Sequence, residues 1–461
     1  MQKYYVHLLL ENSATPTVVR AGTLLVESHL GKYDTRGSFT YDDTYLNNPR
    51  AFPIDPINLP LRTESFEFLS TFHIAGGIFD LLPDAWGDNI LTTMSANQSE
   101  LDAEQILAVI SRTNWLGKEN VGAVRFQASR HNENTFTEVL DKREKESRLQ
   151  DLVSQQVVDE LFEEFFPDIP NPETLWQIGG ARPKAHIERN GSSWIAKFNS
   201  KPKQGIEPIN STAIEYGIAK FMKDKLGMDV VDVDIAIVNA DHCACLVKRF
   251  DQIELDNGAY QQLHFLSFSS LVSLPPPYTG LNTLQRERQK VLMSYPNMAR
   301  IAQQLCSKEK NDVAETFYKR MLINVLFNNT DDHLKNHAIL FNPLTKQYKL
   351  SPAYDVSAQF LDKGYHKPIH MCNLRTDVPY QEAKVGSFEN LIGGGLEMGL
   401  KKPKILALTK EIVEVYRDFK HFFQSLNIPI NERTKHALDK LLEEKLLIAD
   451  QFFHKGNSSY N

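Results

Sequence analysis

The sequence predicts an α+β protein with a β-rich N-terminal part and an all-helical C-terminal part. Residues 1–50 contain short apolar, β-prone runs separated by Gly, Asp and Asn turns. Residues 174–198 read as strands on either side of an Asn190-Gly191 step, which is typical of antiparallel hairpins. From Ile405 onward, apolar residues recur at helical spacing. These three stretches carry the fold prediction.

The composition is that of an ordinary globular protein. The 461 residues allow roughly two or three structural units, and hydrophobic residues make up 42% of the chain. A net charge of −7 argues against a protein that binds nucleic acid through its whole surface. The four cysteines show no zinc-ligand spacing, and no apolar run is long enough for a signal peptide or a membrane span. We therefore expect a cytoplasmic protein that has no membrane partner.

Three consecutive parts are expected along the chain. The first, residues 1–150, combines the early strands with helices and ends in a charged stretch at 130–150. The second, residues 151–275, contains a proline-rich break at 167–172, a glycine-containing loop and a polar hinge. The third, residues 276–461, begins with a proline-rich loop and continues as helices.

The most informative stretch is residues 324–355. An apolar helix ends near Phe327, and a dense polar run follows from Asn328 to His337. A hairpin with a turn at Asn342-Pro343 comes next, and a second acidic loop follows it. A hairpin brings the loops that flank it to one end, so we expect the two polar loops to lie together.

The side chains of these two loops suit phosphoryl transfer. This chemistry requires a carboxylate near the attacking hydroxyl and oxygen ligands that hold Mg²⁺ against the phosphates of ATP. Asp331 is the candidate for the first role, and Asn336 and Asp355 are the candidates for the second. Asp331 and Asn336 have the D-x-x-x-x-N spacing of a kinase catalytic loop, with His333 and Lys335 between them. Such a spacing alone is more often a solvated turn, so the prediction depends on the whole pattern.

A second stretch, residues 174–198, is predicted to contact phosphates. Gly179 and Gly180 allow backbone N–H groups to approach phosphate oxygens without obstruction by a Cβ atom. Lys197, on the strand that returns from the hairpin turn, suits contact with the α and β phosphates. Glu215 on the following helix is a candidate ion-pair partner of Lys197, and a surface glutamate is the equally weighted alternative.

Five motifs resemble those of the HipA family, the serine/threonine kinase toxins of type II toxin–antitoxin modules. The motifs are GGARPKA, WIAKF, VKRFD, NNTDDHLKN and SPAYDV. The segments FDLLPDAWG and LGKENVGAVRF also resemble that family, so the resemblance spans nearly the whole chain. It implies a protein-kinase-like fold of two lobes, with a β-rich N-terminal subdomain, an all-helical C-terminal lobe and ATP in the cleft.

The resemblance also implies roles for individual residues. It makes Asp331 the catalytic residue and Asn336 and Asp355 the Mg²⁺ ligands. Lys248 stands where the family has an acidic residue, which leaves main-chain contacts for that position. The residues expected to contact ATP are Gly179, Gly180, Ala181, Arg182, Pro183, Lys184, Lys197, Lys248, Arg249, Phe250, His333, Lys335, Asn336, Tyr354 and Asp355.

Two positions bear on regulation and partners. Gln177 occupies the position where well-known family members carry a serine whose autophosphorylation ejects the phosphate loop and switches the kinase off. Glutamine cannot be phosphorylated, so we expect control by a partner protein or another site. Lys401 and Lys402 resemble in position a C-terminal contact of the family with the DNA backbone, and a solvated basic turn is the alternative interpretation.

The sequence therefore predicts an ATP-dependent serine/threonine protein kinase that uses Mg²⁺ and acts as a toxin. The resemblance implies growth arrest through phosphorylation of a translation-related protein, such as an aminoacyl-tRNA synthetase. It also implies a helix-turn-helix antitoxin as partner, with DNA reached only through the antitoxin complex. Two alternatives stay open, namely an ATP-binding corepressor with little kinase activity and a small-molecule kinase of the same fold.

Overall fold

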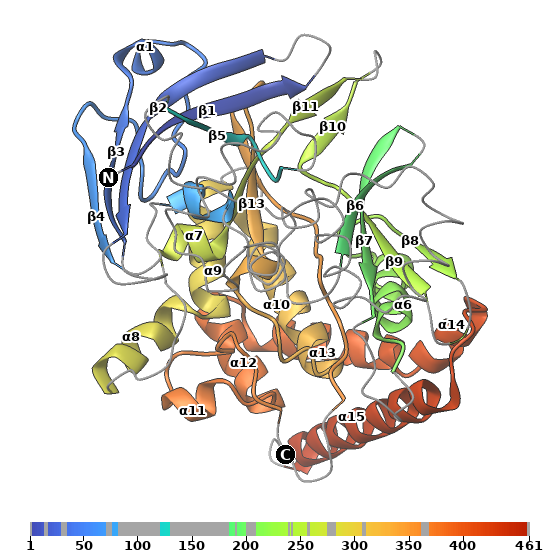
Figure 1. The fold of residues 1–461 in the computed structure, drawn as a ribbon. Helices are drawn as coiled ribbons and strands as arrows, with labels where there is room; N and C mark the ends of the chain where they lie inside the picture. The colour runs from blue at the N-terminus through green and yellow to red at the C-terminus, as the bar shows by residue number, and fades with distance from the viewer. Residues whose placement is uncertain are drawn as a thin grey trace. The chain divides into compact units, whose positions relative to one another are not determined.

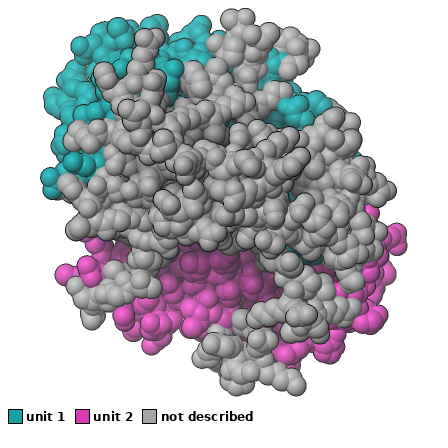
Figure 2. All heavy atoms as spheres, in the orientation of Figure 1, with its two compact units in different colours: residues 1–200, 248–278, 338–348 teal, residues 201–247, 279–337, 349–461 magenta. Residues whose placement is uncertain are grey.

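A computed structural model of the chain forms two compact units (Figure 2). The first unit comprises residues 1–200, 248–278 and 338–348, and the second comprises 201–247, 279–337 and 349–461. The three consecutive parts expected from the sequence stay a prediction. The structure describes residues 2–12, 17–28, 35–70, 76–81, 120–129, 184–189, 191–199, 209–237, 240, 243–255, 259–273, 283–306, 310–360 and 368–458.

An antiparallel sheet with strand order β10-β11-β1-β2-β3-β4 is the main element of the first unit, and β5 also pairs with β1 (Figure 1). Tyr4, Val6 and Leu8 alternate along β1 and are buried, because side chains two residues apart share one face of a strand. The strands are longer than the apolar runs that predict them. Their bounds are β1 Gln2–Asn12, β2 Thr17–Ser28, β3 Thr35–Tyr41, β4 Phe66–Ser70, β5 Val124–Ala128, β10 Gln252–Glu254 and β11 Tyr260–Gln262.

Short elements and two further strand groups complete the first unit. β6 (Lys184–Arg189) and β7 (Ser192–Phe198) form the predicted hairpin, with Gly191 at a φ of +76°, where glycine is favoured. A three-stranded sheet has the order β12-β13-β14, with bounds His264–Ser267, Ala338–Asn342 and Gln347–Leu350. β13 and β14 are the hairpin expected after the polar run. The short helices are α1 Asp43–Leu46, η1 Gly76–Leu81 and α7 Phe268–Val272.

Helices dominate the second unit. Asn210, Ser294 and Ser387 cap the N-termini of three of them, each accepting a backbone N–H through its side chain. A hairpin of β8 (Val233–Ile237) and β9 (Cys243–Lys248) accompanies them. The helices are α6 Ser211–Asp224, α8 Thr283–Leu292, α9 Tyr295–Leu305, α10 Lys310–Leu326, η4 Leu334–Asn336, α11 Tyr380–Ala383, α12 Phe388–Glu397, α13 Lys402–Tyr416, α14 Phe419–Ser425 and α15 Glu432–Ser458. Among the described residues, no helix combines the length and apolar character needed to cross a membrane.

A cluster of aromatic rings fixes the end of α10. The ring of Phe327, which directly follows α10, lies 4.7 Å from that of Phe419 and 5.1 Å from that of Tyr416, centroid to centroid. Phe221 of α6 contacts Phe419 at 5.0 Å. Edge-to-face rings at these separations add to the free energy of burying large apolar surfaces. The cluster therefore holds in place the helix from which the polar loop begins.

The aromatic cluster can be tested with Phe327→Ala. Truncating a buried phenylalanine costs about 3–5 kcal/mol, because apolar contacts are lost and a cavity is left. We expect a clear fall in the thermal unfolding midpoint. Leu447→Ala, at a side chain of α15 that is 59% exposed, is the control and should leave the midpoint nearly unchanged. Equal midpoints for both variants would contradict the assigned role of the cluster.

Candidate active site

The polar run predicted as a catalytic loop begins with a sharp turn at the end of α10. Asn328 has a φ of +53°, a left-handed conformation that asparagine tolerates better than most residues. The backbone N–H of Asn329 donates to the carbonyl oxygen of Asn324 at 2.8 Å, which closes the turn. The chain then passes through Asp331 to the short helix η4 at Leu334–Asn336.

Asp331 and Asn336 lie together in one closed turn. The Nδ2 atom of Asn336 donates to the carbonyl oxygen of Asp331 at 3.3 Å. The backbone N–H of Asn336 donates to the carbonyl oxygen of His333 at 2.9 Å. The side chain of Asp331 is exposed, whereas that of Asn336 is buried. Because its nitrogen is bound to the loop backbone, the Asn336 amide presents its oxygen as an acceptor, and amide oxygens are good Mg²⁺ ligands.

The second acidic loop is hydrogen-bonded to the first at two points. Tyr354 donates its hydroxyl to the carbonyl oxygen of Lys335 at 2.7 Å. Asn329 Nδ2 lies 3.4 Å from the carbonyl oxygen of Asp355. Asp355 itself has a φ of +57°, so its backbone is held in a conformation that few non-glycine residues adopt. The structure thus brings Asn336 and Asp355 onto adjoining loops of one unit, as the sequence predicts.

The stretch before Asp355 is held by the surrounding elements. Ala353 donates its backbone N–H to the carbonyl oxygen of Asp229 at 2.8 Å and accepts from Val231 at 3.0 Å. Arg320, buried on α10, donates to the carbonyl oxygen of Ser351. These contacts fix the backbone on the N-terminal side of Asp355, independently of the catalytic loop.

Asp332, which sequence reasoning did not select, is the buried counterpart of Asp331. Its side chain is only 2% exposed; its Oδ1 atom lies 3.0 Å from Nε2 of His337, and its Oδ2 atom accepts the hydroxyl of Tyr295. Burial alone would raise the pKa of this carboxyl, but the imidazole of His337 and the hydrogen bonds from His337 and Tyr295 hold the pKa below its ordinary value. An ionised carboxylate only accepts, so Nε2 of His337 carries the proton. The sequence contains one local sign of this contact, since Asp332 stands five residues before His337. It contains no local sign of the contact with Tyr295, which lies 37 residues before Asp332.

A later segment binds the catalytic loop from a second side. The backbone N–H groups of Met371 and Cys372 donate to the carbonyl oxygens of Thr330 and Asp332 at 3.0 and 3.1 Å. His370 Nδ1 lies 3.1 Å from the carbonyl oxygen of Asn329 and must carry a proton to bond there. Burial, with a smaller contribution from the positive charge of Lys445, lowers the pKa of His370 to about 4. His370 is therefore neutral at pH 7.

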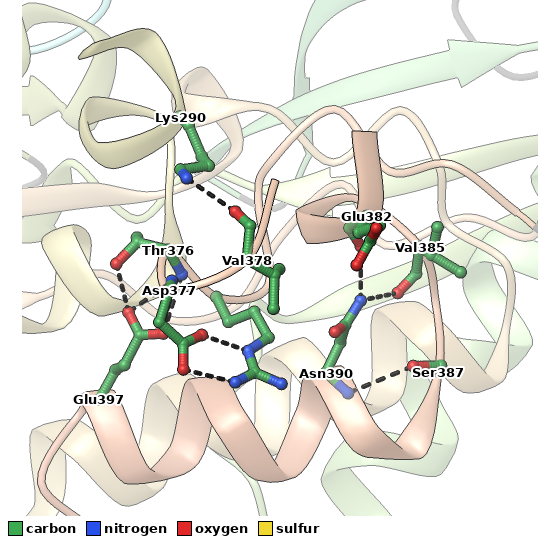
Figure 3. Close-up of polar contacts among 10 residues, drawn as sticks. Lys290, Thr376, Asp377, Val378, Glu382, Val385, Ser387, Asn390 and Glu397 are labelled. Carbon is green, nitrogen blue, oxygen red and sulfur yellow. Dashed lines mark hydrogen bonds and ion pairs between the residues drawn. The ribbon is translucent and has the colours of Figure 1, made fainter. Parts of the chain in front are cut away.

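The continuation of this segment is tied to α8 and α12 (Figure 3). Thr376 donates both its backbone N–H and its hydroxyl to the carboxylate of Glu397 at the end of α12. Lys290 of α8 donates to the carbonyl oxygen of Val378 at 2.7 Å. Asn390 of α12 donates to the carbonyl oxygens of Glu382 in α11 and of Val385. The segment that supports the catalytic loop is thus anchored to two helices.

Two predicted phosphate-binding lysines lie on the hairpin of the first unit. Lys184 of β6 and Lys197 of β7 are directly opposite each other in the register, so both side chains leave the same face of the hairpin. Both are buried. The rest of the predicted phosphate loop lies outside the described residues, namely Gln177, Gly179, Gly180, Ala181, Arg182 and Pro183.

The predicted hinge contains a structural ion pair. The guanidinium of Arg249 is buried, donates to Asp251 Oδ1 at 2.9 Å and donates to the carbonyl oxygen of Asn120 at 2.8 Å. Asp251 also accepts the backbone N–H of Gly122 at 2.7 Å. Lys248 forms an ion pair with Glu254 at 3.2 Å, and the ring of Phe250 lies 6.2 Å from that of Phe265. ATP contacts of Lys248, Arg249 and Phe250 stay a prediction, and the Arg249 side chain is engaged within the first unit.

The remaining predicted residues are placed as follows. Glu215 is buried on α6, which rules out the alternative of a surface glutamate, while its pairing with Lys197 stays a prediction. Lys401 precedes α13 and is exposed, and Lys402 begins that helix. Among the described residues, no group of three or more His, Cys, Asp or Glu side chains could hold a metal ion. The proposed Mg²⁺ set is smaller, one amide and one carboxylate.

Comparisons with known proteins show the family of this chain. A family model described as the HipA-like C-terminal domain matches residues 176–418, and the HipA N-terminal domain model matches residues 19–127. The chain belongs to the HipA family. The family predicted from the five motifs is thereby confirmed.

Individual relatives are more distant. A Sinorhizobium fredii protein named "Putative kinase Y4dM" is 29% identical over 180 residues, which is 37% of this chain and 38% of that protein. A chain of the Shewanella oneidensis complex of HipA, HipB and operator DNA has a similar fold, with a TM-score of 0.62, 14% identity and 97% of both chains covered. The Helicobacter pylori proinflammatory kinase CtkA gives a TM-score of 0.38 at 16% identity, over 59% of this chain and 90% of that one. The predicted α+β fold, β-rich at the N-terminus and helical at the C-terminus, is confirmed by the first of these structures and by the elements described above.

The neutral state of His370 predicts a pH dependence of stability. Its folded-state pKa of about 4 lies below the ordinary value of 6.5, so the unfolded chain binds more protons between these two values. Stability should therefore fall as the pH drops from 6.5 toward 4, by on the order of 3 kcal/mol from this residue. His370→Gln should lose that part of the pH dependence, measured as unfolding midpoints at pH 7 and pH 4.5. Parallel pH profiles for wild type and variant would show that His370 is not responsible.

Proposed function

We propose that this protein is an ATP-dependent serine/threonine protein kinase. The observation that carries the proposal is the pair of hydrogen bonds that join the catalytic loop to the Asp355 loop, from Tyr354 to Lys335 and from Asn329 to Asp355. They place an exposed carboxylate, a buried amide and a second carboxylate on adjoining loops of one unit. Membership of the HipA family supports the same conclusion, as does the kinase name of the Sinorhizobium fredii relative.

Asp331 is assigned as the general base. Its exposed carboxylate can reach a serine or threonine hydroxyl and accept the proton as the hydroxyl oxygen bonds to the γ-phosphorus. The bond between that phosphorus and the β–γ bridging oxygen breaks, and ADP leaves. Asn336 and Asp355 would hold Mg²⁺, because their oxygen donors match its preference for hard ligands. Mg²⁺, when bound, neutralises charge on the phosphates.

Lys184 and Lys197 are assigned to the phosphates of ATP. Their ammonium groups leave one face of the β6–β7 hairpin, and two neighbouring positive charges suit a polyphosphate better than a single anion. The residues from Gly179 to Pro183 would add backbone N–H groups. His333 and Lys335, within the catalytic loop, are assigned to the γ-phosphate side.

The biological role follows from the family. We propose a cytoplasmic toxin that arrests growth by phosphorylating a translation-related protein, such as an aminoacyl-tRNA synthetase. The Shewanella oneidensis complex contains HipA, HipB and operator DNA, which supports an antitoxin partner through which DNA is reached. Exposed Lys401, with Lys402, is the candidate DNA contact in such a complex.

The general-base assignment predicts the behaviour of Asp331→Ala. Wild type and variant are incubated with Mg²⁺, labelled ATP and a cell lysate, and labelled proteins are identified by phosphopeptide mapping. We expect protein labelling by the wild type, a loss of about 10²–10⁴-fold in the variant, and similar ATP affinity in both, because Asp331 acts on the hydroxyl. Equal labelling would refute the assignment. Label in small molecules would indicate a small-molecule kinase, and bound ATP without any labelling would favour an ATP-binding corepressor.

The phosphate-contact assignment predicts weaker nucleotide binding in Lys197→Ala. Loss of a charge-assisted contact to phosphate should raise the ATP dissociation constant by about tenfold or more, measured by titration calorimetry. Lys410→Ala, at an exposed lysine of α13, removes the same charge elsewhere and should leave the constant unchanged. An unaltered dissociation constant in Lys197→Ala would contradict the contact.

A further inference from the structure

A continuous chain of buried hydrogen bonds runs beneath the two acidic loops. Asn329 Nδ2 donates to Asn324 Oδ1 at 2.9 Å, and Asn324 Nδ2 donates to the Tyr295 hydroxyl at 2.7 Å. The Tyr295 hydroxyl donates to Asp332, whose other oxygen lies 3.0 Å from His337 Nε2. All five side chains are buried. Water therefore offers little competition for these bonds.

The two ends of this chain meet the two candidate Mg²⁺ ligands. At one end, the same Nδ2 atom of Asn329 lies 3.4 Å from the carbonyl oxygen of Asp355. At the other end, His337 directly follows Asn336 in the sequence. The hydrogen-bond chain therefore connects the backbone of Asp355 with the residue next to Asn336.

Tyr295 is the middle member and the only one of the five that comes from α9. Its hydroxyl accepts from α10 and donates to the catalytic loop, so both of its hydrogen-bonding directions are used. Its backbone N–H donates to the carbonyl oxygen of Asn373 at 3.0 Å. Its ring also packs edge-on against the imidazole of His337 at 5.6 Å between centroids. The residue is held at two points besides its hydroxyl, which makes the hydroxyl a fixed reference for both loops.

We propose that Tyr295 is a positioning residue, whose hydroxyl sets the separation of Asn336 and Asp355 and thereby the strength with which Mg²⁺–ATP is held. This inference rests on the proposed function. Asp332 belongs to the same hydrogen-bond chain. Its carboxylate oxygens accept hydrogen bonds from Tyr295 and His337, so it does not serve as a second base beside Asp331. Tyr295 touches none of the reacting groups and acts through Asp332 and Asn324.

The test compares Tyr295→Phe with Tyr318→Phe. Both replacements remove one buried hydroxyl and keep the ring, and the Tyr318 hydroxyl bonds to Thr409 of α13 rather than to the loops, within the part of the chain that the structure describes. ATP binding is measured by titration calorimetry with Mg²⁺ and again in EDTA. We expect the gain in affinity that Mg²⁺ provides to fall about tenfold in Tyr295→Phe, with unchanged affinity in EDTA. Tyr318→Phe should keep the full gain. An undiminished gain in Tyr295→Phe, or the same loss in both variants, would overturn the proposal.

A double-mutant cycle tests whether the chain acts as one unit. Asn329→Ala breaks the hydrogen-bond chain at the Asp355 end, because it removes the amide that bonds both Asn324 and the carbonyl oxygen of Asp355. If the two residues act through one chain, the double variant with Tyr295→Phe should lose less of the Mg²⁺ gain than the product of the single losses. Strictly multiplicative losses would contradict a shared chain. Asn329→Ala alone decides the outcome if Tyr295→Phe fails to fold.

The readout separates this inference from the proposed function. Absence of phosphotransfer by the wild type would remove the kinase assignment but would leave the Mg²⁺-dependent binding of ATP measurable. Where the wild type transfers phosphate, Tyr295→Phe should raise the Mg²⁺ concentration for half-maximal rate about tenfold and leave the KM for the protein substrate unchanged. Asp332→Asn, which keeps an acceptor for the Tyr295 hydroxyl, should retain more of the rate than Asp332→Ala. Equal losses in these two variants would count against the positioning role.

Discussion

The buried carboxylate of Asp332 imposes the strictest constraint on the second unit. A charge without access to water is tolerated only when hydrogen-bond donors and an opposite charge surround it, and removing one partner of such a group is costly. The hydroxyl of Tyr295 and the imidazole of His337 must therefore reach this carboxylate. Because these two side chains come from α9 and from the catalytic loop itself, the requirement fixes α9 against the loop. The backbone N–H of Cys372 donates to the backbone carbonyl oxygen of Asp332 and holds the 370–373 segment at the same residue.

The neighbouring residues Asp331 and Asp332 show how environment divides two roles between identical side chains. Asp331 is exposed, whereas Asp332 is buried and accepts hydrogen bonds from Tyr295 and His337. The enclosed carboxylate holds the backbone that carries the exposed one. A base that must accept a proton repeatedly cannot also hold a loop in place, because protonation would release the partners that the loop needs. Under the proposed function, the two tasks are carried by two residues, with Asp331 as the base and Asp332 as the residue that holds the loop.

How far the sequence predicted this site depends on the range of the contacts. The D-x-x-x-x-N spacing identified Asp331 and Asn336, because a turn closed by contacts between near neighbours is visible in a short pattern. The hairpins at 184–198 and 338–350 were predicted for the same reason. Tyr295 and His370 were missed because their partners in the loop lie 37 and 41 residues away, and no local pattern marks such pairs. The bond of the Arg249 guanidinium to the carbonyl oxygen of Asn120, 129 residues earlier, was missed for the same reason, and the nucleotide contact predicted for Arg249 stays a prediction.

The positions of Asp331, Asn336 and Asp355 are set by contacts within a single unit. The side-chain amide of Asn336 is held by its hydrogen bond to the carbonyl oxygen of Asp331. The backbone at Asp355 is held by the contact with Asn329 and by the backbone hydrogen bonds of Ala353, two residues earlier, with Asp229 and Val231. A left-handed φ at Asp355 persists only if its surroundings overdetermine it, and those contacts supply that constraint. Preorganised oxygen ligands lose little freedom when a cation binds, so the energy of binding is available for holding the phosphates. Under the proposed function, the buried hydrogen-bond chain beneath the loops would contribute to catalysis by fixing Asn336 and Asp355 before Mg²⁺ binds, although none of its five side chains would react.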